Sequence, residues 1–141
     1  MAAGRANTER EPFGACISRI ERAFESAGVK AQPGIVTSRD ETAARLTRLL
    51  TVKDMPVGFR KWQLPVYHKG PTHLFVTVAE AGAKVAPHNH EGDSTRFVVS
   101  GSIIVAGKEL TAGDWMFIPA RTNYSFEVGG LGAVMAAGYE C

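Results

Sequence analysis

The hydrophobic period of the chain changes near Gly58, and this change most constrains the fold. Before it, apolar residues recur at helical spacing in residues 13–27 and 40–50, so we expect two amphipathic helices. After it, apolar residues recur at period two in short runs separated by Gly or Pro. The expected strands are residues 59–64, 72–79, 95–99, 102–106, 115–118 and 124–128. Many short strands with such turns are typical of an all-β sandwich or barrel.

The change of period also predicts how the chain is organised. We expect an N-terminal helical extension over residues 1–57 and a β-barrel over residues 58–141. The first ten residues are small and polar, and we expect them to be disordered. With 141 residues, 45% of them hydrophobic, the chain can bury a core without disulfides or metal staples.

Two histidines, His88 and His90, stand two residues apart in the β-rich half. On an extended backbone, side chains at i and i+2 point to the same face, so both imidazoles can reach one metal ion. Pro87 disfavours a helix here, and Gly92 allows a turn just after the pair. The alternative is a pair of exposed histidines near a loop.

The segment around this pair resembles the first motif of the cupin family. Gly82 is followed after five residues by His88-Asn89-His90, and Gly101 stands eleven residues further on. The resemblance covers roughly residues 72–128. It implies a double-stranded β-helix, the cupin or jelly-roll barrel, behind the helical extension.

A later stretch resembles the second cupin motif. It runs from Gly107 through Leu110-Thr111-Ala112-Gly113-Asp114 to Ile118-Pro119. Two of the four metal-ligand positions of the family pattern are changed. The family has Glu where this chain has Ser94, and His where this chain has Tyr124.

The resemblance implies a metal site that keeps His88 and His90 as ligands. Two neutral imidazoles suit Fe(II), Mn, Ni, Cu and Zn alike, and we expect Fe first, with a metal-free barrel left open. A usable site needs a third protein ligand. The candidates are Tyr124, His73 from the neighbouring strand, and Glu91 or Asp93 from the loop.

Arg96 is conspicuous if the histidines face the barrel interior. The same parity then turns Ser94, Arg96 and Val98 inward. A guanidinium keeps its charge, so burial demands a partner, and an anionic group of the substrate can be that partner. The alternatives are an outward-facing Arg96, or a structural salt bridge with Glu91, Asp93 or Glu109.

These residues support two classes of function. In the first, the protein is a metal-dependent, dioxygenase-like enzyme acting on a small anionic, keto or phenolic substrate that Arg96, Ser94 and His73 bind. In the second, the barrel is a metal-free cyclase, isomerase or ligand-binding module. There Tyr124 donates a proton, His88 or His90 acts as base, and Arg96 stabilises an oxyanion. A structural or interaction protein is a third possibility.

The composition of the chain indicates which classes of binding partner to expect. The formal net charge is +2 and diffuse, which does not indicate nucleic-acid binding. Two cysteines, Cys16 and Cys141, and the lack of an 18-residue apolar run predict a reduced, soluble, cytoplasmic protein without a membrane partner. Small cupins resemble obligate dimers in many cases, so we expect a homodimer.

Overall fold

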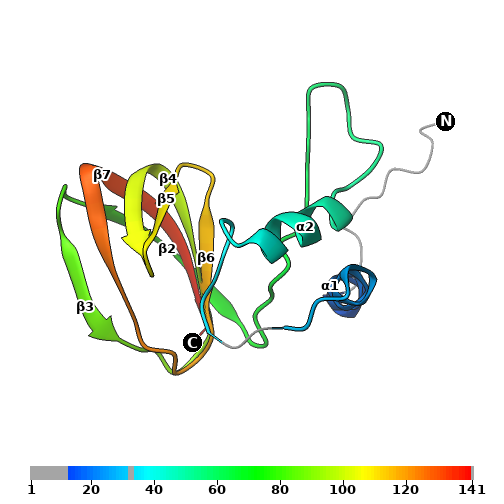
Figure 1. The fold of residues 1–141 in the computed structure, drawn as a ribbon, viewed down its shortest axis with the longest axis horizontal. Coiled ribbons are helices and arrows are strands. Elements are labelled where there is room, and N and C mark those ends of the chain that lie inside the picture. The colour runs from blue at the N-terminus through cyan, green and yellow to red at the C-terminus, as the bar shows by residue number, and fades with distance from the viewer. Residues whose placement is uncertain (1–12, 32–33, 141) are drawn as a thin grey trace. The chain divides into compact units, whose positions relative to one another are not determined.

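The structure, a computed structural model, describes residues 13–31 and 34–140. The chain divides into two units (Figure 1). Of the described residues, 13–31 and 41–67 form a helical unit, whereas 34–40 and 68–140 form a barrel unit. The predictions for residues 1–10 and for Cys141 lie outside the described residues.

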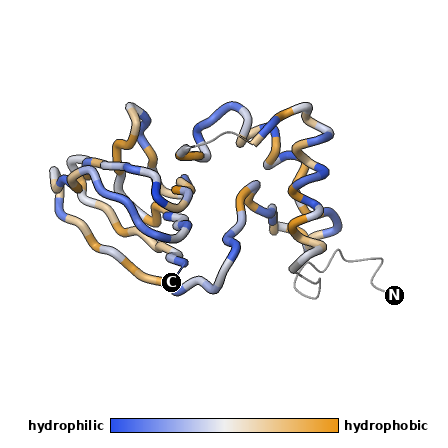
Figure 2. The backbone as a smooth tube through the Cα atoms, turned by 90° about the horizontal axis from the view of Figure 1, so that it is seen from below, coloured by the Kyte–Doolittle hydropathy of each residue, from blue (hydrophilic) through white to orange (hydrophobic). Residues whose placement is uncertain are grey.

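Two helices, α1 (Phe13–Ala27) and α2 (Glu41–Leu49), confirm the helical prediction. Helix α1 ends at Gly28, whose φ of +64° suits a residue without Cβ. Hydrophobic and hydrophilic residues follow one another along both units (Figure 2). Neither described helix is long and apolar enough to cross a membrane.

The two helices pack on each other through the apolar faces that the sequence predicts. Ile20 and Ala23 of α1 meet Leu46 and Leu50 in one buried cluster. The helical spacing of residues 40–50 predicts that Leu49 lies on the same side, but Leu49 is 50% exposed. That expectation is wrong because Leu46 and Leu50, one turn apart, already occupy the inward positions.

The strand predicted over residues 59–64 does not form. Its only pairing is a single bridge between Trp62 and Thr51. The neighbouring Gln63 bonds to the helices instead: its backbone N–H donates to Leu50 O at 3.0 Å, and its side-chain Nε2 donates to Cys16 O at 2.9 Å. The helices thus hold this segment in the helical unit. The predicted domain boundary at 57/58 remains a prediction.

Within the described residues, the barrel unit has seven antiparallel strands. Their order is β1-β6-β4-β7-β2, with β3 paired to β7 and β5 paired to β4. The strands are β1 (Val36–Thr37), β2 (Thr72–Ala79), β3 (Lys84–His88), β4 (Ser94–Val105), β5 (Lys108–Thr111), β6 (Trp115–Ile118) and β7 (Tyr124–Glu140). Strands β2 and β6 have the predicted bounds.

Two long strands, β4 and β7, join the two ends of the barrel. The first half of β4 pairs with β6, and its second half pairs with β5. The first residues of β7 pair with β3, and its last eight pair with β2. The sheet therefore curls around one core, as Figure 1 shows. The predicted all-β double-stranded β-helix is confirmed.

The core of the barrel unit comes from residues that alternate along these strands. Its fully buried side chains include Ile103, Leu110, Met116 and Met135. Tyr124 and Phe126 of β7 extend this cluster toward the histidine pair.

The bends of β4 and β7 depend on two glycines that approach each other closely. Gly101 and Gly132 both have positive φ values, +74° and +73°. A Cβ on Gly101 would stand 1.9 Å from the carbonyl oxygen of Gly132. This contact explains why glycine occupies position 101, where the first motif has its last residue.

Hydrogen bonds join the residues that follow the short strand β1 to Asp114. Asp114 follows the turn before β6. Its carboxylate accepts hydrogen bonds from the Thr111 N–H, from the Ser38 hydroxyl at 2.9 Å and from Arg39 at 2.9 Å. Partial burial alone raises the pKa of Asp114, but these bonds outweigh burial and hold the pKa below its usual range.

We predict that Gly101→Ala lowers the free energy of unfolding by on the order of 3 kcal/mol or more, because the new methyl group meets backbone that cannot move aside. Gly107→Ala is the matched control. Gly107 also has a positive φ, +75°, but no atom lies within 4 Å of an added Cβ. The control therefore carries only the left-handed backbone penalty of about 1–2 kcal/mol. Equal losses in urea denaturation of the two variants would contradict the close-approach explanation.

Candidate functional site

The histidine pair lies where β3 ends. His88 is the last residue of β3 and pairs with Tyr124 of β7, after a register shift that follows Val85. The rings of His88 and His90 are 5.0 Å apart between centroids, and His88 lies 4.5 Å from the Tyr124 ring. The structure thus brings both predicted histidines together with Tyr124.

Hydrogen bonds constrain the protonation of this cluster. Nδ1 of His88 lies 2.8 Å from the carbonyl oxygen of Ala86. A carbonyl only accepts, so Nδ1 of His88 donates in this contact. Nε2 of His90 lies 3.2 Å from the hydroxyl of Tyr124, a hydrogen bond whose donor is set by the tautomer of the imidazole.

The surroundings lower the pKa of His90 and raise the pKa of Tyr124. Burial, and then the charges of His88 and Arg96, lower the pKa of His90 below its usual 6.5. Burial, and then the neighbouring Tyr139, raise the pKa of Tyr124 above its usual 10.0, although Arg96 opposes the shift. Near neutral pH the imidazole is therefore a free base, and the phenol keeps its proton.

Arg96 points into the barrel, as the sequence parity predicts. It is 6% exposed, with Ser94 and Val98 buried on the same face of β4. Its Nη2 donates to the Tyr139 hydroxyl, and its guanidinium lies 5.3 Å from the centre of the Phe126 ring. Such aromatic faces stabilise a cation without neutralising it.

The alternative for Arg96, a structural salt bridge with Glu91, Asp93 or Glu109, does not form. Glu91 pairs with Arg121 at 3.4 Å, and Asp93 accepts a backbone N–H at 2.9 Å. Glu109 is exposed on β5. Among the described residues, no carboxylate forms an ion pair with Arg96. A cation is buried here without a counter-charge.

Two polar atoms on the inner face of β4 are buried without a hydrogen-bond partner within the described part of the chain: Oγ of Ser94 and Nε of Arg96. Leaving such groups unpaired costs roughly 1–3 kcal/mol each. Few native structures keep such groups without a reason, so this pair indicates a place for a ligand atom or water.

The sequence analysis missed Tyr139. It stands opposite Ser94 in the β4–β7 register and lies 5.2 Å from the His90 ring. The predicted strand stopped at residue 128, whereas β7 continues to Glu140. The sequence feature that could have revealed the longer strand is the spacing of two between Ala133, Met135, Ala137 and Tyr139. This spacing turns all four side chains inward.

His73, predicted to bind substrate, stands opposite Tyr139 on β2 and therefore shares its face of the sheet. Its side chain is exposed. The structure does not place it against the histidine pair, so its role remains a prediction.

The donor set around the histidines does not fit a tightly held metal ion. Among the described residues, no three His, Cys, Asp or Glu side chains gather as ligands. Glu91 and Asp93, weighed as third ligands, are engaged elsewhere. The Arg96 guanidinium, whose charge acts on His90, repels a nearby cation.

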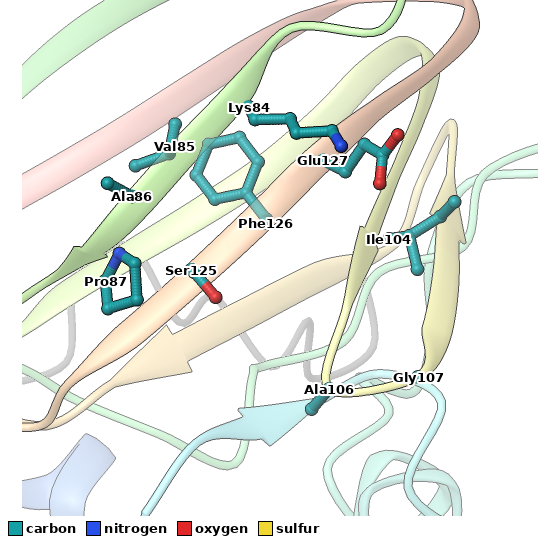
Figure 3. A pocket seen from close by; sticks show the side chains of 10 residues that line it. All are labelled: Lys84, Val85, Ala86, Pro87, Ile104, Ala106, Gly107, Ser125, Phe126 and Glu127. Carbon is teal, nitrogen blue, oxygen red and sulfur yellow. The ribbon is translucent and has the colours of Figure 1, made fainter.

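Two open pockets lie in the barrel unit. One, of about 390 Å³, is lined by His90, Tyr139 and three neighbouring residues, and so leads to the cluster just described. Another, of about 540 Å³, lies between β3, β7 and the β4–β5 hairpin (Figure 3). There Lys84 and Glu127 point toward one another, and most other lining residues are apolar. None of the predicted site residues lines this second pocket.

The sequence matches no protein-family model and no curated protein. Several solved structures are similar in fold. A protein of unknown function with a cupin-like fold from Ralstonia eutropha is 15% identical, with a TM-score of 0.46 over 52% of this chain and 49% of its own. An RmlC-like cupin from Shewanella frigidimarina is 25% identical, with a TM-score of 0.44 over 48% and 64%. KdgF from a Halomonas species is 19% identical, with a TM-score of 0.45 over 79% and 84%.

This chain therefore spans less than two thirds of the length of the first two structures. At these TM-scores the likeness concerns the fold and assigns no activity. The strand order and the two motif segments define a double-stranded β-helix. The barrel unit has the cupin fold, in agreement with the family resemblance of its sequence.

Proposed function

We propose that the barrel unit binds a small organic anion and transfers protons on it without a metal ion. The observation that supports this most is the contact between the Tyr124 hydroxyl and the neutral His90 imidazole, 3.2 Å apart, with the charge of Arg96 acting on both groups. An acid, a base and a fixed positive charge close together are the elements of an isomerase or cyclase.

Each residue has a distinct role in this proposal. Arg96 binds the anionic group and stabilises negative charge that develops next to it. His90, which is neutral near pH 7, accepts a proton from the substrate carbon. Tyr124, which is protonated, donates to the substrate oxygen. The free Nε2 of His88 is a second possible base, because its Nδ1 proton is held by Ala86.

We predict that the protein exchanges the α-protons of a small 2-keto carboxylate for deuterium in D₂O. Tyr124→Phe and His90→Gln are each expected to slow this exchange by about 10²-fold or more, as for a lost general acid or base. NMR of a panel of such acids measures the rate. Tyr67→Phe, which removes the same hydroxyl in the helical unit, is the control and keeps the wild-type rate. Exchange that is equally fast in all variants, or absent with every acid, would refute the proposal.

A metal-dependent, dioxygenase-like activity is the second candidate. One observation favours it: the ring centroids of the two imidazoles lie 5.0 Å apart. Elemental analysis of the unsupplemented protein distinguishes the candidates. The first predicts far less than one ion per chain and exchange that survives EDTA. One Fe, Mn, Ni, Cu or Zn ion per chain, lost in His88→Ala and His90→Ala, would favour the second.

We also propose that the chain forms a homodimer through the outer face of the barrel unit. Leu74, Val76 and Val78 of β2 are 75–87% exposed, and the register places Val76 on the same face as the exposed Phe97 of β4, with Ala136 of β7 between them. Strand β2 is an edge strand without a charged residue. An uncharged, apolar edge strand tends to pair with another chain. In a two-fold dimer, the second copy contributes the same surface to the interface.

We predict that Val76→Lys turns the dimer into a monomer, because the charge would lie buried in the interface. Light scattering after size-exclusion chromatography measures the mass. Val57→Lys is the control, since Val57 is fully exposed in the helical unit and outside this face. A wild-type monomer, or a Val76→Lys dimer, would rule out this interface. The cytoplasmic location also remains a proposal.

A further inference from the structure

We infer that Ser94 and Arg96 form a subsite for a carboxylate group, with Tyr139 holding the guanidinium in place. This inference rests on the proposed function, because it specifies the anion that the barrel binds. It depends on three side chains of β4 and β7 that face one another across the strand pair.

The two unpartnered atoms lie on the same strand and the same face. Ser94 and Arg96 are two residues apart on β4, and both are at least nine-tenths buried. Oγ of Ser94 and Nε of Arg96 can each donate one hydrogen bond. An anionic ligand that accepts hydrogen bonds from both atoms satisfies the two donors and neutralises the charge of Arg96.

The position of the guanidinium is already set before any ligand binds. Nη2 of Arg96 donates to the hydroxyl of Tyr139, and the rings of Tyr139 and Phe126 lie 5.8 Å and 5.3 Å from the guanidinium carbon. Nη1 contacts the sulfur of Met135 at 3.9 Å. These contacts engage Nη1, Nη2 and the plane of the group, whereas Nε has no hydrogen-bond partner among the described residues.

Two donors and one positive charge match a carboxylate better than other anions. A carboxylate has two oxygens and a single negative charge, so Arg96 neutralises it and each donor meets one oxygen. A phenolate offers one oxygen for the two donors. A phosphate brings further oxygens and up to a second charge, for which the neutral His90 and Tyr124 provide no compensation.

The surrounding rings favour a flat apolar body attached to the carboxylate. Phe75 packs edge-on against Tyr139 at 5.5 Å, and His90 does so from another side at 5.2 Å. Aromatic pairs of this kind accept a further ring. Benzoate is therefore a suitable probe, and benzamide is its neutral counterpart of nearly the same shape.

Calorimetric titration with benzoate, benzamide and inorganic phosphate tests this subsite. We expect the wild-type protein to bind benzoate at least tenfold more tightly than either of the others. Ser94→Ala is expected to weaken benzoate binding about tenfold, and Arg96→Gln about 100-fold, with circular dichroism showing that both barrels fold. Ser100→Ala, at an exposed position of the same strand, and Arg121→Gln keep wild-type affinity.

The same titration separates this inference from the proposed proton transfer. Tyr124→Phe, which keeps its ring, loses exchange activity but keeps benzoate binding if both proposals hold. Benzoate binding without any exchange activity would leave the subsite standing and remove the catalytic proposal. The subsite is wrong if benzoate fails to bind at millimolar concentration, if phosphate or benzamide binds equally well, or if Ser94→Ala and Arg96→Gln both bind as the wild type does.

Discussion

The burial of the Arg96 guanidinium without a carboxylate partner is the constraint on which the rest of the site depends. A guanidinium cannot shed its proton, so the barrel must stabilise the charge by contacts alone. The hydroxyl of Tyr139 and two aromatic rings do so in part, while Nε remains unpaired. Burial and the charge of His88 lower the pKa of His90, and the Arg96 charge adds to them; burial raises the pKa of Tyr124, and Arg96 opposes that rise. In the proposed function, Arg96 therefore contributes to both ligand binding and proton transfer.

The backbone brings these groups together through the two long strands. Strand β7 contributes Tyr124 from the part that pairs with β3 and Tyr139 from the part that pairs with β2. The close approach of Gly101 and Gly132 makes the bends that let β4 and β7 reach both ends of the barrel. Strands β4 and β7 therefore both build the barrel and carry residues of the candidate site.

Much of the barrel could be predicted from alternation and motif spacing. Parity alone placed Ser94 and Arg96 inward, because side chains alternate over the first part of β4, residues 94–98. The helices followed from the 3.6-residue period. Residues 59–64 were mistaken for a strand because Phe59, Trp62 and Leu64 stand among polar residues, although Gln63 binds to helix α1. Tyr139 was missed because the small residues before it weaken the strand signal. The partners of Glu91 and Asp93 are long-range contacts that no local pattern reveals.

The free energy of unfolding of ligand-free Arg96→Met tests the central claim most directly. Methionine fills a similar volume without a charge, so the variant removes the unpaired cation and leaves most of the packing. If Arg96 is held for a ligand, urea denaturation in carboxylate-free buffer should show a barrel as stable as the wild type or more stable. A loss of about 3 kcal/mol or more would contradict the claim, because a loss of that size follows when a well-paired buried charge is removed.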